Sequence, residues 1–278
     1  MINSLINFFL KKNIILKNKY IGETCYIFGN GSSLKRVSLK YFSNKYTFSC
    51  NWMSLHKDYK LLTKNIGYSL TTPFFFSPFS KNPYLKKIKY NIARKVFLKN
   101  FFFEKDNLFT SIANYPFLAN KPNIYYLHDF GNKKLDIKYN DLAGEFSLMS
   151  SALYSMIGIA KYMGFTKIIL IGMDYLYDQP VLGHFYERKF NTFIDVNEKS
   201  FADKRKKDII FFEDLKKNID LLLLAPEGRS SGFIKTESYA KFFSTKEENF
   251  TNYDLVDLEN LNLLDKCEYR YNIFDNKY

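Results

Sequence analysis

The sequence has few cysteines, and their positions exclude several classes of small, cross-linked protein. Only three occur among 278 residues, namely Cys25, Cys50 and Cys267, and none belongs to a Cys-x-x-Cys pair. This spacing argues against a disulfide framework and against a structural zinc site, and it is typical of a chain in a reducing cytoplasm. Internal repeats are absent, as are the spacings of zinc fingers, RNP motifs and helix-turn-helix domains.

Long hydrophobic runs are also lacking, so no segment is expected to cross a bilayer. Residues 1–22 contain short apolar runs and four lysines, and no small-residue cleavage site follows them, which argues against a standard signal peptide. This N-terminal basic amphipathic segment is predicted either to lie on an anionic membrane surface or to pack across the domain. The expected location is the cytoplasm, with peripheral contact to the inner face of the cell membrane under the first alternative.

Acidic residues are outnumbered by basic ones. Lys and Arg total 41 against 28 Asp and Glu, which gives a formal net charge of +13. This charge favours anionic partners, a class that includes nucleic acid, anionic lipid and phosphorylated small molecules. Because the basic residues are scattered along the chain rather than concentrated in one arm, a dedicated nucleic-acid-binding function is not expected.

The chain does contain an alternation of apolar strands and helices, and it is long enough to bury a large core. Apolar residues recur at helical spacing over residues 152–163, Gly164 follows, and the apolar run 167–172 is typical of a buried parallel strand. Further strands are predicted at residues 23–28, 46–50, 66–70, 123–127 and 219–224. The sequence therefore predicts an α/β fold with a Rossmann-like, mostly parallel sheet flanked by helices and carrying a small insertion or lid.

Three regions are predicted along the chain. The N-terminal segment at 1–22 precedes a Rossmann-like domain at 23–234, and a helical appendage follows at 235–278. The appendage carries leucines at helical spacing, which are Leu255, Leu258, Leu261 and Leu264. It is expected to pack on the body, to mediate a homo-oligomer or to touch a membrane, and these alternatives remain open.

Small polar groups follow three successive predicted strands. Gly29-Asn30-Gly31-Ser32 comes after the first strand, Asn51 after the second and Thr72 after the third. Ligands of open α/β sheets bind at the carboxyl ends of the strands, and glycines let the backbone approach a phosphate closely. The turn lacks the third glycine of a dinucleotide fingerprint and the GK[ST] of a P-loop. A glycine turn that binds no ligand is the alternative.

The segment after the strand at 167–172 carries the candidate catalytic groups, namely Asp174, Tyr175, Tyr177 and His184. An imidazole is a natural general base near neutral pH, so His184 is predicted to be the base of this segment. A structural or capping histidine is the alternative. No DxD-type cluster follows a strand, and the chemistry is therefore expected to need no metal ion.

These motifs together resemble those of a group of Rossmann-like proteins. The resemblance rests on GNGSSL (29–34), Asn51, MGFTKIILIGMDY (163–175) and GHFY (183–186), and it covers most of the chain from Cys25 to about Phe233. The group includes the bacterial CMP-sialic-acid sialyltransferases of glycosyltransferase family 42 and the MptE-like proteins of surface-polysaccharide clusters. Membership would imply a variant of the GT-A fold.

The resemblance also implies an activity. It is the transfer of an acidic sugar, either sialic-acid-like, another nonulosonic acid or Kdo, from a CMP-activated donor to an oligosaccharide or lipid-linked glycan acceptor. The CMP-sugar is a substrate, and no cofactor is implied. His184 matches the base, and Asp174 with Tyr175 matches an Asp-aromatic pair. Further residues implied to bind substrate are Gly29, Asn30, Gly31, Ser32, Asn51, Thr72, Ser150, Ser151, Tyr186, Arg188 and Ser230, with Tyr175, Tyr177 and Tyr186 as candidates for holding the leaving phosphate.

The spacing departs from the sialyltransferase pattern at one point. Those enzymes have a lid between the Asp-aromatic pair and the histidine, whereas only residues 176–183 intervene here. The short spacing is more similar to that of the MptE-like proteins, and a lid is expected instead at about 185–207. Two other functions therefore stay open, which are an MptE-like pyrophosphokinase dependent on ATP and Mg²⁺, and a non-catalytic nucleotide-sugar-binding protein.

Overall fold

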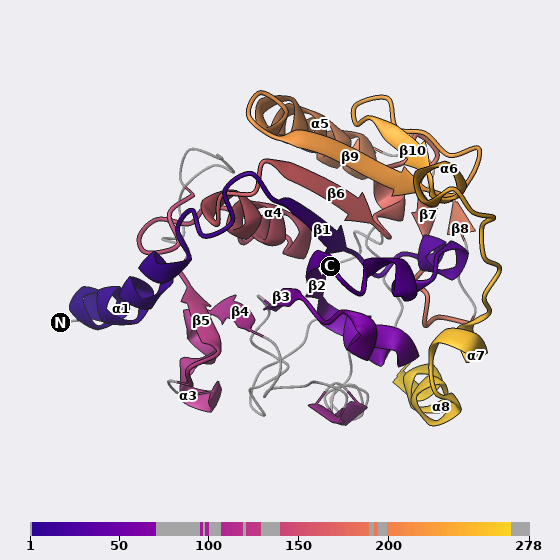
Figure 1. Ribbon diagram of the computed structural model, residues 1–278. Coiled ribbons are helices and arrows are strands. Elements are labelled where there is room, and N and C mark those ends of the chain that lie inside the picture. The colour runs from indigo at the N-terminus through magenta and orange to yellow at the C-terminus, as the bar shows by residue number, and fades with distance from the viewer. Residues whose placement is uncertain are drawn as a thin grey trace.

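An eight-stranded sheet organises the computed structural model, which describes residues 2–70, 95–96, 98–99, 107–118, 121–128, 140–188, 192–193 and 199–267. All of its strand pairings are parallel, in the order β10-β9-β6-β1-β2-β3-β4-β5 (Figure 1). The strands are β1 (Thr24–Phe28), β2 (Tyr46–Cys50), β3 (Asn65–Leu70), β4 (Leu108–Ser111), β5 (Ile124–Leu127), β6 (Lys167–Ile171), β9 (Asp220–Ala225) and β10 (Thr236–Ser238). The predicted α/β fold with a parallel sheet is confirmed.

The strand order reverses beside β1. The chain moves outward from β1 through β2, β3 and β4 to β5, and then returns to place β6 on the other side of β1. In open α/β sheets, the loops on the two sides of such a reversal diverge and leave a crevice at the carboxyl ends of the strands. The loops that follow β1 and β6 lie at this edge of the sheet.

Helices cover one face of the sheet, where α4 (Ala152–Tyr162) lies against β1, β2 and β3 and α5 (Lys199–Leu215) lies near β9 (Figure 1). Ser151 is the N-cap of α4, and its hydroxyl accepts a hydrogen bond from the Tyr154 N–H at 3.1 Å. Gly164, with φ +91°, follows the helix in the left-handed region that favours glycine. The opposite face carries short 3-10 helices, which are η2 (Ser32–Arg36), η3 (Leu39–Phe42), η4 (Asn51–Leu55) and η5 (Lys57–Leu61).

The remaining elements lie at the ends of the sheet and around its rim. They are α1 (Ile2–Lys11), η1 (Lys12–Leu16), η7 (Ile112–Asn114), α3 (Tyr115–Leu118), η8 (Asp174–Leu176), the antiparallel pair β7 (Val181–Leu182) and β8 (Thr192–Phe193), α6 (Tyr239–Phe243), α7 (Asn252–Leu255) and α8 (Leu258–Cys267). None of the helices within the described ranges is long and apolar enough to cross a membrane.

The C-terminal region contributes to the sheet as well as to its surface. β10 pairs in parallel with β9, so the boundary predicted at residue 234 precedes the last strand of the sheet. Leu255, Leu261 and Leu264 are buried, whereas Leu258 is 57% exposed. Most of the predicted leucine stripe therefore packs on the body of the protein.

The N-terminal segment packs against the opposite end of the sheet. Asn13 is fully buried, and its amide donates hydrogen bonds to the Tyr126 carbonyl of β5 at 2.8 Å and to the Leu142 carbonyl at 2.6 Å. Phe9 and Leu16 are also buried, while Phe8 is 64% exposed. One side of this segment is thus fixed to the domain, and the other side presents apolar residues to the surroundings.

Candidate active site

The loops that follow β1 and β6 are joined through their backbones. The Gly29 N–H donates to the Ile171 carbonyl at 2.8 Å, and the Gly31 N–H donates to the Gly172 carbonyl at 2.9 Å. A Cβ atom at Gly29 would lie 2.3 Å from the Gly172 oxygen, which is far inside van der Waals contact. The two glycines of the predicted nucleotide loop are therefore required by the close approach of these loops.

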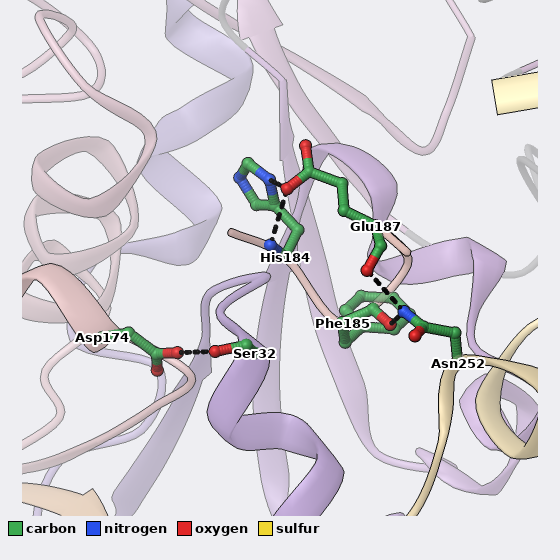
Figure 2. Close-up of polar contacts among 6 residues, drawn as sticks. All are labelled: Ser32, Asp174, His184, Phe185, Glu187 and Asn252. Carbon is green, nitrogen blue, oxygen red and sulfur yellow. Dashed lines mark hydrogen bonds and ion pairs between the residues drawn. The ribbon is translucent and has the colours of Figure 1, made fainter. Parts of the chain in front are cut away.

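Asp174 locks this loop in place, as Figure 2 shows for its contact with Ser32. Its carboxylate accepts hydrogen bonds from the Ser32 hydroxyl at 2.9 Å, from the Ser33 N–H at 2.8 Å and from the Ser33 hydroxyl. Burial raises the pKa of Asp174, and the hydrogen bonds from Ser33 and Ser32 act against that rise because they stabilise the charged carboxylate. Asp174 thus shapes the site by holding the loop.

His184 lies beside the same loop. It forms an isolated antiparallel bridge with Gly31, and the next residue, Phe185, donates its N–H to the Asn30 carbonyl at 3.0 Å. The expected convergence of the glycine turn and His184 at one rim is therefore present in the structure. The side chain of His184 remains partly accessible, with 24% of its surface exposed. It is therefore accessible from solvent at this rim of the sheet.

Two groups hold the His184 ring. Glu187 places Oε2 3.0 Å from Nδ1, and Figure 2 shows the second ring nitrogen on the far side of the imidazole from this carboxylate. The ring of Tyr186 stacks on the imidazole, with centroids 5.0 Å apart and planes 5° from parallel. An imidazole held in this way beside the glycine loop is a group that can carry out proton transfer.

Asn30 and Asn51 lie at the carboxyl ends of β1 and β2. The Asn30 amide donates to the Cys50 carbonyl at 3.2 Å, and within the described residues its Oδ1 atom is buried with no hydrogen-bond partner. A buried, unsatisfied acceptor is costly unless a ligand or water pairs with it. Asn51 has φ +50° and is partly exposed at the start of η4. Asn30 therefore offers an acceptor at this rim.

Cys50 is not available as a nucleophile in this site. It is 5% exposed, and burial raises the pKa of its thiol to about 12. A thiol at neutral pH then carries almost no thiolate, which is the reactive form. The chemistry at this edge is left to the imidazole and to hydroxyl and amide groups.

The predicted tyrosines occupy different environments. Tyr177 is buried, and its hydroxyl donates to Asp174 Oδ1 at 3.4 Å. Tyr175 faces α5, where the Lys204 ammonium lies 4.6 Å from its ring centroid and Arg205 donates to its carbonyl at 3.0 Å. Burial raises the pKa values of the Tyr175 and Tyr177 hydroxyls well above their usual range. Of the three candidate tyrosines, Tyr186 is the one in ring contact with His184.

Other predicted residues make contacts within the protein. The Ser230 hydroxyl donates to Asp178 at 2.8 Å, and Arg188 pairs with Asn262 at 2.7 Å and with Asp265 at 3.4 Å on α8. The Ser151 hydroxyl is occupied as the cap of α4, and Ser150 is exposed beside it. Thr72 lies outside the described residues. Their contacts with a donor stay predictions.

Glu187, Asn252 and Tyr239 contact these groups but were not among the predicted site residues. Glu187 lies three residues after His184, so short-range spacing was the available signal for it. Tyr239 places its hydroxyl 3.3 Å from the Ser33 hydroxyl across 206 residues, and Asn252 contacts Phe185 across 67. Contacts at such separations leave no local pattern in a single sequence.

Metal-ligating side chains do not gather in groups of three or more His, Cys, Asp or Glu within the part of the chain that the structure describes. The predicted independence from metal ions remains a prediction, as does the absence of a cofactor.

Comparison with known proteins gives structural neighbours of one kind. No family model matches the sequence, and no curated protein matches it. The sialyltransferase CstII from Campylobacter jejuni, in a complex with cytidine-5'-monophosphate, is similar with a TM-score of 0.42 and 20% identity, covering 88% of this chain and 98% of that chain. The monofunctional alpha-2,3-sialyltransferase Cst-I from Campylobacter jejuni is similar with a TM-score of 0.39 and 20% identity, and the match covers 84% of each chain. The sialyltransferase CST-II in complex with a trisaccharide acceptor and CMP is similar with a TM-score of 0.43 and 20% identity. That match covers 88% of this chain and 99% of the CST-II chain. Likeness at this level assigns no family.

Proposed function

We propose that this protein is a glycosyltransferase that transfers an acidic sugar from a CMP-activated donor to a glycan acceptor of a surface polysaccharide. The observation that carries this proposal is the pairing of His184 with Gly31, which sets a candidate base beside the candidate nucleotide loop. A transferase needs both groups within reach of one sugar, because the donor phosphate and the acceptor hydroxyl attach to the same carbon during the reaction. The choice of CMP-activated acidic sugars comes from the sequence resemblance to family 42.

In the proposed reaction, the acceptor hydroxyl loses its proton to the imidazole of His184 as its oxygen attacks the anomeric carbon of the donor. The bond between that carbon and the phosphate oxygen breaks, and CMP leaves with the bonding electrons. The Ser32 hydroxyl and the Gly29, Gly31 and Ser33 amides already donate hydrogen bonds within the protein. The backbone amides of Asn30 and Ser32 are therefore the groups of the glycine loop that bind the phosphate and stabilise its developing charge in this proposal. Asn30 and Asn51 bind the nucleoside. Tyr186 positions the imidazole and adds a hydroxyl near the departing group.

Asp174 and Tyr177 have positioning roles in this proposal. Both are buried, and Asp174 accepts hydrogen bonds from Ser32 and Ser33. The carboxylate therefore acts on the donor through the loop that it holds. No step in the proposed reaction requires a metal ion, because the monophosphate of a CMP-sugar is already a good leaving group.

Ligand-dependent thermal stability tests this proposal. We expect CMP to raise the melting temperature without added metal, since binding to the native state stabilises it by about 2.7 kcal/mol at roughly 100 times Kd. CDP, UDP, ATP with Mg²⁺ and a pterin serve as comparisons. Stabilisation by ATP with Mg²⁺ or by the pterin, without stabilisation by CMP, would overturn the proposal in favour of a pyrophosphokinase. If CMP binds but no acidic sugar is transferred, the transferase proposal is overturned in favour of a non-catalytic nucleotide-sugar-binding protein.

The N-terminal segment supports a second proposal, which is peripheral binding to an anionic membrane. Its outward side carries Phe8, Ile14, Ile15 and Ile21, whose exposed fractions are 64%, 55%, 66% and 71%. Residues 1–22 contain four lysines and no acidic residue. Apolar side chains flanked by lysines match the interfacial region of an anionic leaflet, where burial of apolar area and attraction to lipid headgroups add together.

Vesicle sedimentation tests the membrane proposal. Replacing both Phe8 and Ile15 by glutamate is expected to reduce co-sedimentation with phosphatidylserine vesicles by 10-fold or more. The reason is that each apolar side chain buried in the membrane contributes on the order of 1.5–3 kcal/mol to the binding free energy. The double change of Ile209 and Ile210 to glutamate on α5 is the matched control, because these side chains are also exposed, at 37% and 71%. Equal losses in both variants, or no loss in the first, would contradict this surface.

A further inference from the structure

One carboxylate oxygen fixes both the backbone and the ring of His184. Glu187 Oε2 accepts a hydrogen bond from the His184 backbone N–H at 2.9 Å and lies 3.0 Å from the ring nitrogen Nδ1 (Figure 2). The Glu187 N–H donates back to the His184 carbonyl at 3.1 Å, which closes the turn. The Glu187 side chain is only 11% exposed. Solvent therefore competes weakly for this contact.

The contact favours a proton on one nitrogen of His184. Glu187 Oε2 lies 3.0 Å from Nδ1 without meeting hydrogen-bond geometry there, and the negative charge of the carboxylate favours a proton on this nearer nitrogen. In the neutral ring, Nδ1 then holds the hydrogen and Nε2 holds the lone pair. Nε2 is the nitrogen on the far side of the ring from Glu187 (Figure 2). It is the atom that can accept a proton from a substrate.

Asn252 holds the turn that carries Glu187. Its amide donates two hydrogen bonds, to the Phe185 carbonyl at 2.6 Å and to the Glu187 carbonyl at 2.8 Å (Figure 2). Its amide oxygen accepts from the Lys35 ammonium at 3.2 Å. The Phe250 N–H donates to the Lys35 carbonyl at 2.9 Å, so the segment before α7 also pairs with η2. Asn252 thus connects the histidine turn to the helix that begins at Ser32.

We propose that Glu187 and Asn252 are positioning residues for the base of the proposed transferase, with Glu187 selecting the Nδ1–H tautomer of His184 and Asn252 fixing the turn. This inference rests on the proposed function for its catalytic meaning. Glu187 acts through the ring, and Asn252 acts through the carbonyls of Phe185 and Glu187. By this inference the C-terminal segment, which the sequence analysis assigns to an appendage, contributes a positioning residue to the site.

The tautomer can be measured without any substrate. Long-range ¹H–¹⁵N spectra distinguish Nδ1–H from Nε2–H imidazoles, and the chain has only three histidines, so a His184→Ala spectrum assigns the signal. We expect wild-type His184 in the Nδ1–H form. In Glu187→Ala it is expected to shift toward the Nε2–H form, whereas Glu187→Gln, whose amide oxygen still accepts, should retain the wild-type form.

Asn252→Asp tests the second residue with almost no change in shape. The new carboxylate faces two carbonyl oxygens, so it repels the turn instead of holding it. We expect broadened or doubled His184 signals in this variant. Glu213→Ala on α5 is the control, because Glu213 contacts Lys216 and lies 57% exposed.

The inference is overturned if wild-type His184 is in the Nε2–H form, if Glu187→Ala leaves the tautomer unchanged, or if Asn252→Asp leaves the His184 signals as they are. Transfer assays on the same variants address the catalytic role, where Glu187→Ala is expected to reduce kcat on the order of 100-fold with little change in the donor KM. A tautomer shift in a protein with no transferase activity would refute the proposed function while leaving the structural role of Glu187 intact.

Discussion

Replacing His184 with alanine is expected to lower the rate of sugar transfer by about 10²–10⁴-fold, the range typical of a lost general base. The affinity for CMP is expected to remain close to that of the wild type. His184 contributes its backbone to the bridge with Gly31 and its N–H to Glu187, and alanine preserves both of these backbone groups. Single-turnover transfer assays and calorimetric titration with CMP measure the two effects separately.

His128→Ala provides a matched control for this prediction. His128 follows β5 at the far end of the strand order, and it is partly exposed like His184. Its replacement should leave transfer unchanged. Equal rates in His184→Ala and the wild type would remove His184 as the base. A parallel loss of CMP affinity would instead show that its side chain supports the nucleotide loop.

The fold was predictable because the strands of a buried parallel sheet are apolar runs. β1, β6 and β9 each carry four or five buried, mostly apolar residues in succession, and this continuous pattern is visible in the sequence. In β2, buried Thr47 and Ser49 alternate with Phe48 and Cys50. The short edge strand β10 was missed, since its three residues, Thr236–Ser238, are all only partly buried and form no apolar run. β4 was missed as well, because its four residues, Leu108–Ser111, are two apolar residues followed by two polar ones, and so short an apolar run does not mark a strand.

The sequence located the loops that carry the site, but it did not show what several of their side chains contact. The rule that ligands bind at strand carboxyl ends located the turn at Gly29 and the segment at His184. It did not reveal that Asp174 faces inward to Ser33, because a carboxylate after a strand looks the same in sequence whether it binds a ligand or a loop. Ser230 is a similar case, since its partner Asp178 lies 52 residues away.

Replacing Gly31 with alanine is the second change with a large expected effect. A Cβ atom at this position would lie 2.4 Å from Asp174 Oδ1 and 2.7 Å from the Gly172 carbonyl oxygen. Both neighbours are buried and fixed by hydrogen bonds, so the loop must move away from them. We expect a loss of stability of roughly 1–3 kcal/mol or more from overpacking, together with loss of CMP binding. Urea unfolding and calorimetric titration measure these effects.

Gly144→Ala separates this close approach from a general cost of replacing glycine. The nearest atom to a Cβ at Gly144 is Asp141 Oδ2 at 3.1 Å, on an exposed side chain that needs to shift by only a few tenths of an ångström. The free energy of unfolding of that variant should therefore lie within about 0.5 kcal/mol of the wild-type value. If Gly31→Ala behaves in the same way and still binds CMP, the loops after β1 and β6 are not in the contact described. His184 would then lack the bridge that sets it beside the nucleotide loop, and the candidate active site would lose its basis.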